Sequence, residues 1–253
     1  MSEDRIVQER MSAEEGRLVM PFYLICDVSF SMYKEMPALN EGVRRLRQAI
    51  VSEPVVDDVA QVSIMTFSDT AKIIVPMGPM SESEVPELAA ENTTNYGLAF
   101  RALAEAIEQD SARFREQGYK IYRPCAFFLT DGLPTDHDWH KTFVSTLTYD
   151  KQSGRGMKAH PIFVPFGFRD ALEEVLGQLA YPPERSRWYH ARDMPIERVL
   201  KGVLGIIMNT IVSSSRTATT GQPTIVQQPP EKDSGIVQGE STYKPDYDPD
   251  YLS

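Results

Sequence analysis

Short runs of consecutive apolar residues recur along much of the chain and predict the strands of a sheet. Uninterrupted runs of this length are typical of strands that are buried on both faces. The runs that fit this pattern are residues 18–26, 59–67, 72–75, 125–130, 162–166 and 187–191.

Between these runs, apolar residues recur every three or four positions, which predicts amphipathic helices. The expected helices cover residues 36–50, 97–114, 139–147, 172–179 and 196–211. The runs at 59–67 and 72–75 are joined by the short turn Ser68-Asp69-Thr70, which predicts an antiparallel hairpin. We therefore expect an α/β fold: a doubly wound, mostly parallel central sheet with one antiparallel edge strand and helices on both faces.

The composition changes near Ser213 and divides the chain into three parts. Residues 213–253 hold nine apolar residues against eleven Ser or Thr and five Pro, which predicts a disordered acidic tail. Residues 1–17 alternate acidic and basic side chains without the apolar stretch of a secretory signal, so they form an N-terminal extension and export by that route is not expected. Residues 18–212 are expected to form one domain.

Charge and cysteine usage narrow the classes of function. The net charge is −10, with 26 basic residues against 36 acidic ones, which excludes nucleic acid as an expected partner. No apolar stretch reaches the roughly 18 residues of a membrane span. Cys26 and Cys125 each lie inside an apolar run, which predicts buried free thiols and a reducing, cytoplasmic location.

The first predicted strand ends in LICDVSFSM, which places Asp27, Ser29 and Ser31 in the loop after it. Ligands of open α/β sheets bind at this end of the strands. One carboxylate and two hydroxyls at spacings of two can converge on a small, hard cation, so the pattern favours Mg²⁺ or Mn²⁺. The alternative to a metal site is a purely structural role, in which Asp27 caps the next helix and Ser29 satisfies the loop backbone.

Two later loops add oxygen-bearing residues at the same expected edge of the sheet: Thr94 in TTNYG and Asp131 in LTDGLPTD. With these, residues 18–212 resemble the von Willebrand factor A (integrin I-like, Rossmann-like) family. Its metal-ion-dependent adhesion site (MIDAS) is built from a DxSxS loop, a separate Thr and a separate Asp. The resemblance implies a metal site of Asp27, Ser29, Ser31, Thr94 and Asp131.

In the family, the two Ser and the Thr contact the metal directly, the Asp residues often act through water, and one position stays open for an acidic side chain of a partner. The sequence departs from the family at two points. Phe30 stands where Gly is common and could narrow access to the metal, and ENTTN replaces Gly-Gly-Thr. Thr93 is therefore a second candidate ligand, but Thr94 is favoured because it precedes Gly97 by three positions, as in the family.

Within the family, MPFYLICDVSFSM, ALNEGV and FLTDGLPTD look most like bacterial tellurite-resistance TerY-like proteins. That resemblance implies a cytoplasmic protein-binding module in a tellurite or general stress-response system. Its partner would supply Glu or Asp to the metal, and a protein kinase, phosphatase or Ter-family protein is the candidate.

An enzyme is the rival class. The sequence lacks GxxxxGK[ST], HExxH and GxSxG, so we expect no enzymatic activity. A Mg²⁺-dependent phosphoester hydrolase remains the alternative, although Asp27 and Asp131 supply only negative charge to it. A scaffold with a purely structural metal is the third possibility.

Two weaker patterns remain. His137 and His140 suggest a second metal site, but without a third nearby ligand a solvated helix start is favoured. Tyr243, Tyr247 and Tyr251 recur every four residues among the aspartates of the tail. The tail is either a solvated acidic end or a segment whose aspartate, anchored by a tyrosine, competes for the open metal position.

Overall fold

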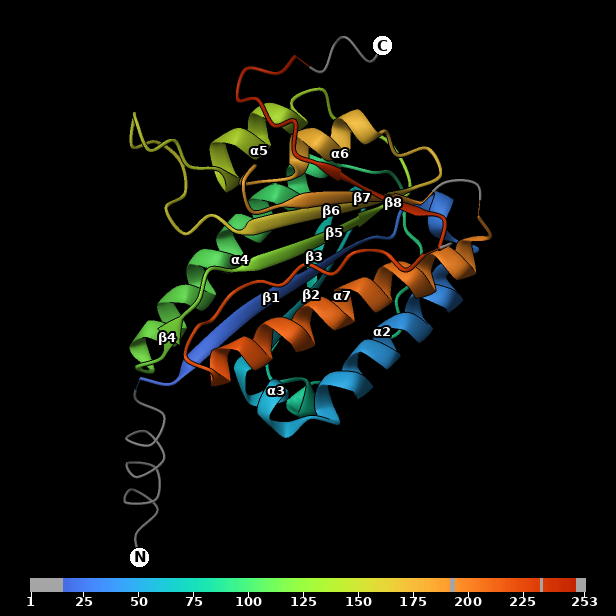
Figure 1. The fold of residues 1–253 in the computed structure, drawn as a ribbon. Helices are drawn as coiled ribbons and strands as arrows, with labels where there is room; N and C mark the ends of the chain where they lie inside the picture. The colour runs from blue at the N-terminus through green and yellow to red at the C-terminus, as the bar shows by residue number, and fades with distance from the viewer. Residues whose placement is uncertain (1–15, 192–193, 233, 249–253) are drawn as a thin grey trace, which may run out of the picture.

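In the computed structural model, which describes residues 16–191, 194–232 and 234–248, a single sheet crosses the whole protein (Figure 1). Its strands run in the order β3-β2-β1-β5-β6-β7-β8, and the short β4 also pairs with β1. Neighbours from β2 to β7 along this path are parallel, whereas β3 and β8 pair antiparallel at the two edges. The strands are β1 (Leu18–Asp27), β2 (Ala60–Phe67), β3 (Ala71–Gly78), β4 (Lys120–Ile121), β5 (Cys125–Thr130), β6 (Ile162–Phe168), β7 (Arg187–Ala191) and β8 (Ile236–Glu240).

Helices cover both faces of the sheet (Figure 1). One face holds α2 (Met36–Val51), α3 (Pro54–Val59) and α7 (Ile196–Thr219), and the other holds α4 (Tyr96–Glu116), α5 (Trp139–Leu147) and α6 (Glu173–Leu179). Two short 3₁₀ helices, η1 (Phe30–Met32) and η2 (Met80–Glu82), lie in the connecting loops. No helix among the described residues combines the length and apolar character needed to cross a membrane.

The central strand β1 explains the uninterrupted apolar runs, because both of its faces are covered. Phe22 and Leu24 face the α2 and α7 layer, whereas Tyr23 and Ile25 face α4 and α5. On the second face, six rings of Phe67, Tyr96, Phe100, Phe128, Phe143 and Phe163 pack against one another, and we call them the aromatic layer. Phe67 and Phe128 stack with their centroids 4.8 Å apart.

Every strand and helix that the sequence pattern predicts is present, and the doubly wound fold with helices on both faces is confirmed. Cys26 and Cys125 are buried free thiols. In the register, Cys26 pairs with Leu129, four residues beyond Cys125, which places the two cysteines about 13 Å apart along the strands and excludes a disulfide.

The described part of residues 213–253 is not the structureless tail that its composition predicts. Helix α7 extends to Thr219, and β8 adds a second antiparallel edge strand to the sheet beside β7. Polar side chains also bind this segment to the domain: Val226 N–H donates to Ser214 Oγ at 2.9 Å, and Tyr189 OH donates to Gln228 O at 2.8 Å. Composition alone overlooks such binding, because a segment poor in apolar residues can still pair with an open strand edge. Residues 1–15 of the N-terminal extension lie outside the described residues.

The aromatic side chains of the C-terminal segment pack on α5. The Tyr243 ring lies 4.9 Å from Tyr181 and 6.4 Å from Phe143, while Tyr247 lies 5.2 Å from His140 (ring centroids). His140 is buried, which corrects the expectation of a solvated helix start at this position, whereas His137 is exposed. Tyr251 lies outside the described residues.

Candidate metal site

The predicted site residues lie where the sheet changes its direction of winding. The chain leaves β1 through α2 and pairs β2 on one side of β1, whereas β5 pairs on the other side after α4. The loop after β1 leads to α2 on one face of the sheet and the loop after β5 leads to α5 on the other, so the two loops diverge at the carboxyl ends of these strands, where ligands of such sheets bind. Asp27 ends β1 and Asp131 follows β5, so both lie at this edge of the sheet.

Asp27 is buried and both of its oxygens accept hydrogen bonds. Ser29 N–H donates to Oδ1 at 2.9 Å, and Thr130 Oγ1 donates to Oδ2 at 2.8 Å. Asp27 therefore accepts from the loop backbone, a role that the capping alternative gives to Ser29, and it does not cap α2, whose N-cap is Glu35. Thr130 in turn accepts from Tyr96 OH at 3.0 Å, which connects the site to the aromatic layer.

Two hydroxyls and a second carboxylate form a connected group next to Asp27. Ser29 Oγ and Ser31 Oγ lie 3.0 Å apart, and Ser31 Oγ donates to Asp131 Oδ1 at 2.8 Å. Neighbouring oxygens on an octahedral Mg²⁺, each about 2.1 Å from the ion, are about 3 Å apart. The spacing and the all-oxygen chemistry of this group therefore fit a hard divalent cation.

Thr94 lies on the loop that leads into α4. Its carbonyl accepts from Thr135 N–H at 2.9 Å and from Thr135 Oγ1 at 2.6 Å, which ties this loop to the one after β5. Thr94 is buried and Thr93 is exposed. No hydrogen bond between described residues joins the Thr94 hydroxyl to the serines, so its place among the ligands stays a prediction.

The loop after β5 also holds the start of α4 in place. The carboxylate of Asp136 accepts from Tyr96 N–H at 2.9 Å and from Gly97 N–H at 2.8 Å. A Cβ atom on Gly97 would lie 2.7 Å from Asp136 Oδ2, so glycine is required for this close approach. Asp136 and Gly97 thus fix the start of α4, which directly follows the Thr94 loop.

Arg169 and Glu35 belong to the site, although the sequence analysis missed both. Arg169 Nη1 donates to Ser31 O at 2.8 Å and to Asp131 Oδ2 at 3.2 Å, and Nη2 pairs with Glu35 Oε1. Glu35 is buried, and its Oε2 has no hydrogen-bond partner among the described residues. A lone Arg after a strand and a Glu before a helix form no motif, so only their position in the fold reveals them.

Burial governs the electrostatics of the carboxylates. It raises the pKa of Asp27 to about 6, and the negative charge of Asp131 adds to the rise while hydrogen bonds from Ser29 and Thr130 oppose it. Burial also raises the pKa of Asp131, against the hydrogen bond from Ser31. These carboxylates hold negative charge that their surroundings compensate only in part, and a divalent cation would stabilise their ionised forms.

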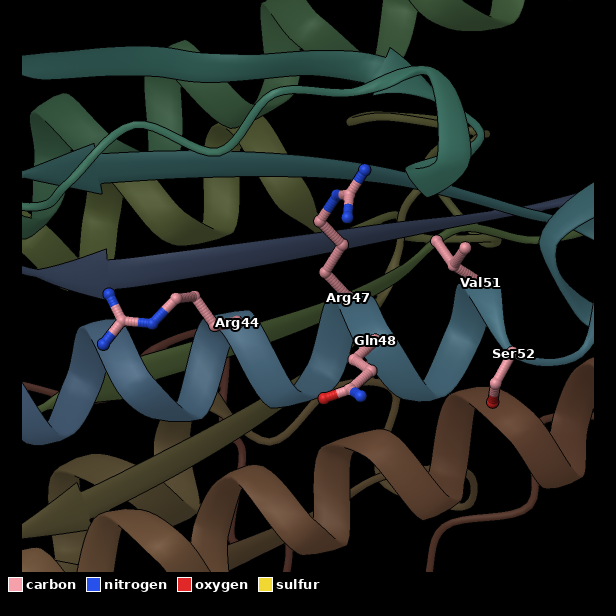
Figure 2. A pocket seen from close by; sticks show the side chains of 5 residues that line it. All are labelled: Arg44, Arg47, Gln48, Val51 and Ser52. Carbon is pink, nitrogen blue, oxygen red and sulfur yellow. The ribbon is translucent and has the colours of Figure 1, made fainter.

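Other parts of the described structure offer no comparable set. No three His, Cys, Asp or Glu side chains among the described residues form a group that could hold a metal, and this includes His137 and His140. A hollow of about 450 Å³ lies on α2, lined by Arg44, Arg47, Gln48, Val51 and Ser52. Its side chains leave the helix in different directions (Figure 2), so they do not converge on one ligand.

Comparisons with known proteins agree with this architecture. Residues 22–133 match the family model of the von Willebrand factor type A domain. A comparison with curated protein sequences finds no match.

Solved structures resemble the fold over most of the chain. A von Willebrand factor type A protein from Catenulispora acidiphila matches 78% of this chain and 43% of its own, at 14% identity and a TM-score of 0.53. The pilus adhesin SpaC from Lactobacillus rhamnosus GG, in an open conformation, matches 78% and 30%, at 13% identity and a TM-score of 0.53. Proximal thread matrix protein 1 from the mussel byssus, solved with a zinc-occupied MIDAS motif, matches 78% and 48%, at 14% identity and a TM-score of 0.49.

The chain spans less than half the length of each of these structures. At such identities the likeness concerns the fold. Residues 22–133 are therefore similar to the von Willebrand factor type A domain, and the fold is like that of the solved von Willebrand factor type A protein.

Proposed function

We propose that this protein is a metal-dependent protein-binding module. One observation supports the proposal most directly: Ser29, Ser31 and Asp131 come from two loops about 100 residues apart and join through oxygens 2.8–3.0 Å from one another, and Asp27 accepts from the backbone N–H of Ser29 at 2.9 Å. A cation at their centre would stabilise the carboxylates that burial penalises.

In this proposal, Ser29, Ser31 and Thr94 bind the cation through their hydroxyls, and Asp27 and Asp131 act through water. Mg²⁺ is the proposed ion and Mn²⁺ the substitute. The bound cation supplies one coordination position that accepts a Glu or Asp side chain of the partner. The protein's own residues orient the hydroxyls, because Asp27 accepts from the backbone N–H of Ser29 and so fixes the loop that carries both serines.

The setting that we propose follows from the TerY-like resemblance of the sequence. It is a cytoplasmic tellurite or general stress-response system of a bacterium, with a protein kinase, phosphatase or Ter-family protein as the partner. Affinity purification of partners in Mg²⁺, compared with the same procedure in chelator, tests both the partner and its dependence on the metal.

Phosphoester hydrolysis is the rival function, and Arg169 bears on it. Arg169 brings a cation to the site, but two carboxylates of the chain already pair with it. Asp27 is 1% exposed and both of its oxygens are occupied, so it is poorly placed to activate water. We therefore propose that the protein is not an enzyme. Mg²⁺-dependent turnover of a generic phosphoester that is lost in Asp131→Ala would overturn this view.

Thermal unfolding tests the cation itself. An ion that binds only the folded protein stabilises it by about 2.7 kcal/mol at a concentration one hundred times its dissociation constant. We expect the melting temperature to rise with millimolar Mg²⁺ or Mn²⁺ and to return when chelator is added. A melting temperature that is indifferent to both ions would contradict the proposal. A pull-down that survives chelation would favour a scaffold with a structural metal.

A further inference from the structure

Exposed apolar side chains gather on the loops that surround the candidate metal site. The described residues include seven large apolar side chains that are exposed, and four of them lie on these loops. Phe30 and Tyr33 belong to the loop after β1, Leu133 to the loop after β5, and Leu172 to the loop after β6. Scattered exposed apolar residues are ordinary, but a cluster around a polar site is typical of an interaction surface.

Phe30 and Tyr33 form a defined pair. Phe30 is 74% exposed and Tyr33 is 68% exposed, and their rings stack with centroids 6.4 Å apart at an angle of 20°. The backbone under them is held, because Phe30 N–H donates to Asn92 O at 2.9 Å and Tyr33 N–H donates to Phe30 O at 3.1 Å. Phe30 lies between Ser29 and Ser31 in sequence, so the exposed ring belongs to the same short loop as the two proposed ligands.

Arg169 supplies charge on the same surface. Among the described residues it is the one non-glycine residue with a left-handed backbone, at φ 55°. Glycine adopts this conformation with less strain than arginine does. Non-glycine residues with such a backbone cluster at functional sites. Its side chain is 35% exposed, and Nε has no hydrogen-bond partner among the described residues. Arg169 can therefore donate to an incoming acceptor while it still holds Asp131 and Glu35.

We propose that Arg169 and the Phe30–Tyr33 pair form a second contact for the partner, so that the surface selects a protein segment with an acidic residue next to an aromatic or large aliphatic one. One carboxylate oxygen binds the cation and the other accepts from Arg169, while the apolar neighbour packs on the two rings. This inference rests on the proposed function and adds what the partner must look like. A guanidinium beside the cation suits a carboxylate, and the net charge of −10 opposes anionic membranes and nucleic acid.

The two kinds of contact predict effects of opposite sign for one variant. Arg169→Gln removes a positive charge beside the cation, so Mn²⁺ alone should bind equally well or more tightly. The same variant removes a donor for the partner's carboxylate, so partner binding should weaken about tenfold. A merely structural role for Arg169 would weaken both.

The experiment uses the full chain in Mn²⁺ to select peptides from a displayed random library. We expect enrichment of Asp or Glu directly next to Phe, Tyr, Trp, Leu or Ile. The dissociation constant of one enriched peptide is then measured for the wild type, for Arg169→Gln and for Phe30→Ser/Tyr33→Ser, and Mn²⁺ affinity is measured in parallel by calorimetry. The expected loss of peptide affinity in the aromatic variant is about tenfold or more.

Matched controls are Arg113→Gln, which removes an arginine paired with Asp110 at the other end of α4, and Val55→Ser, which removes an exposed apolar residue of α3. Both should bind the peptide as the wild type does. Peptides that lack the acidic–apolar pair, a failure to enrich any peptide, or wild-type peptide affinity in either site variant would overturn this inference. Binding of wild-type protein to phosphatidylserine vesicles that requires Phe30 would assign the surface to a membrane and also overturn it. Peptide binding that persists in chelator would instead overturn the proposed metal-dependent function.

Discussion

The candidate metal site and the aromatic layer lie next to each other, joined by Tyr96, yet different forces hold them together. The Tyr96 ring packs 4.9 Å from Phe128 and 5.9 Å from Phe100, and its hydroxyl lies within hydrogen-bond distance of two acceptors in the site, Thr130 Oγ1 and Gly132 O. The layer consists of buried rings without charge. The site contains buried carboxylates, an arginine with a left-handed backbone, and an oxygen of Glu35 that has no hydrogen-bond partner in the described part of the chain.

This difference means that the aromatic layer mainly stabilises the fold, whereas the candidate metal site mainly serves binding. Apolar packing in the layer stabilises the fold through contacts that are already complete. The site keeps groups whose partners are incomplete, and such arrangements persist where a ligand completes them. Variants in the layer should therefore change the stability of the protein far more than its binding, and variants in the site should do the reverse.

The largest effect on stability should come from the layer itself. Phe143 is fully buried and contacts Phe100 and Phe163 at centroid distances of 5.1 Å each. Phe143→Ala should lower the free energy of unfolding by about 3–5 kcal/mol, because it removes the ring and leaves a cavity. Denaturant unfolding measures this loss. Mn²⁺ affinity of the folded variant should stay at the wild-type value, and a loss of metal binding would contradict the separation.

Asp131→Ala should have its main effect on the metal. The variant removes one carboxylate of the site and the partner of Ser31 and Arg169, so the stabilisation of about 2.7 kcal/mol expected at one hundred times the dissociation constant should vanish. The metal-free variant should still fold, since Asp131 lies in a loop outside the core. Thermal unfolding with and without Mg²⁺ decides this, and wild-type stabilisation by Mg²⁺ would remove Asp131 from the site.

The loss of stability at low pH should show how strongly burial disfavours the charged form of a histidine. His160 is buried beside Tyr181, and burial, aided by Arg123, lowers its pKa to about 4. Below the ordinary pKa of about 6.5 the unfolded chain takes up a proton that the folded protein refuses, so stability should fall as the pH drops from about 6.5 towards 4.

For this group the loss at pH 5 relative to pH 8 is about 2 kcal/mol. Urea unfolding of the wild type and of His160→Gln at both pH values measures it. The variant should lose less stability on acidification, and an equal slope in both proteins would show that His160 already accepts its proton in the fold.

The smallest expected changes in stability come from variants of two tyrosines, one packed on the domain and one exposed. Tyr243 packs on Tyr181 and donates to Thr148 Oγ1 at 3.2 Å, whereas Tyr33 is exposed beside the site. Tyr243→Ala should lower stability by about 1–2 kcal/mol, and Tyr33→Ala should change it by less than about 0.5 kcal/mol. Thermal unfolding of the two variants gives the comparison. A larger loss from Tyr33→Ala would mean that the exposed pair supports the fold.

The same contrast shows which features the sequence could predict. The central strands were predictable because burial on both faces requires apolar residues throughout, as in β1 and β5. Asp27, Ser29, Ser31 and Asp131 were predictable as a group because each follows a predicted parallel strand, and such strands end at one edge of the sheet. The ligand role of Thr94 stays a prediction, since its loop has no strand of its own to place it.

Local pattern by itself determined the strands, the helices and the loops that hold the acidic and hydroxyl side chains, because hydrophobic periodicity and loop chemistry depend on near neighbours in the chain. Only the tertiary structure decided the pairing of β8 with β7, the contact of Arg169 with Glu35 and Asp131, and the packing of Tyr243 on α5. These contacts join residues between 38 and 134 positions apart, or segments on opposite sides of a long helix, and their energy depends on distances in space that no local pattern encodes.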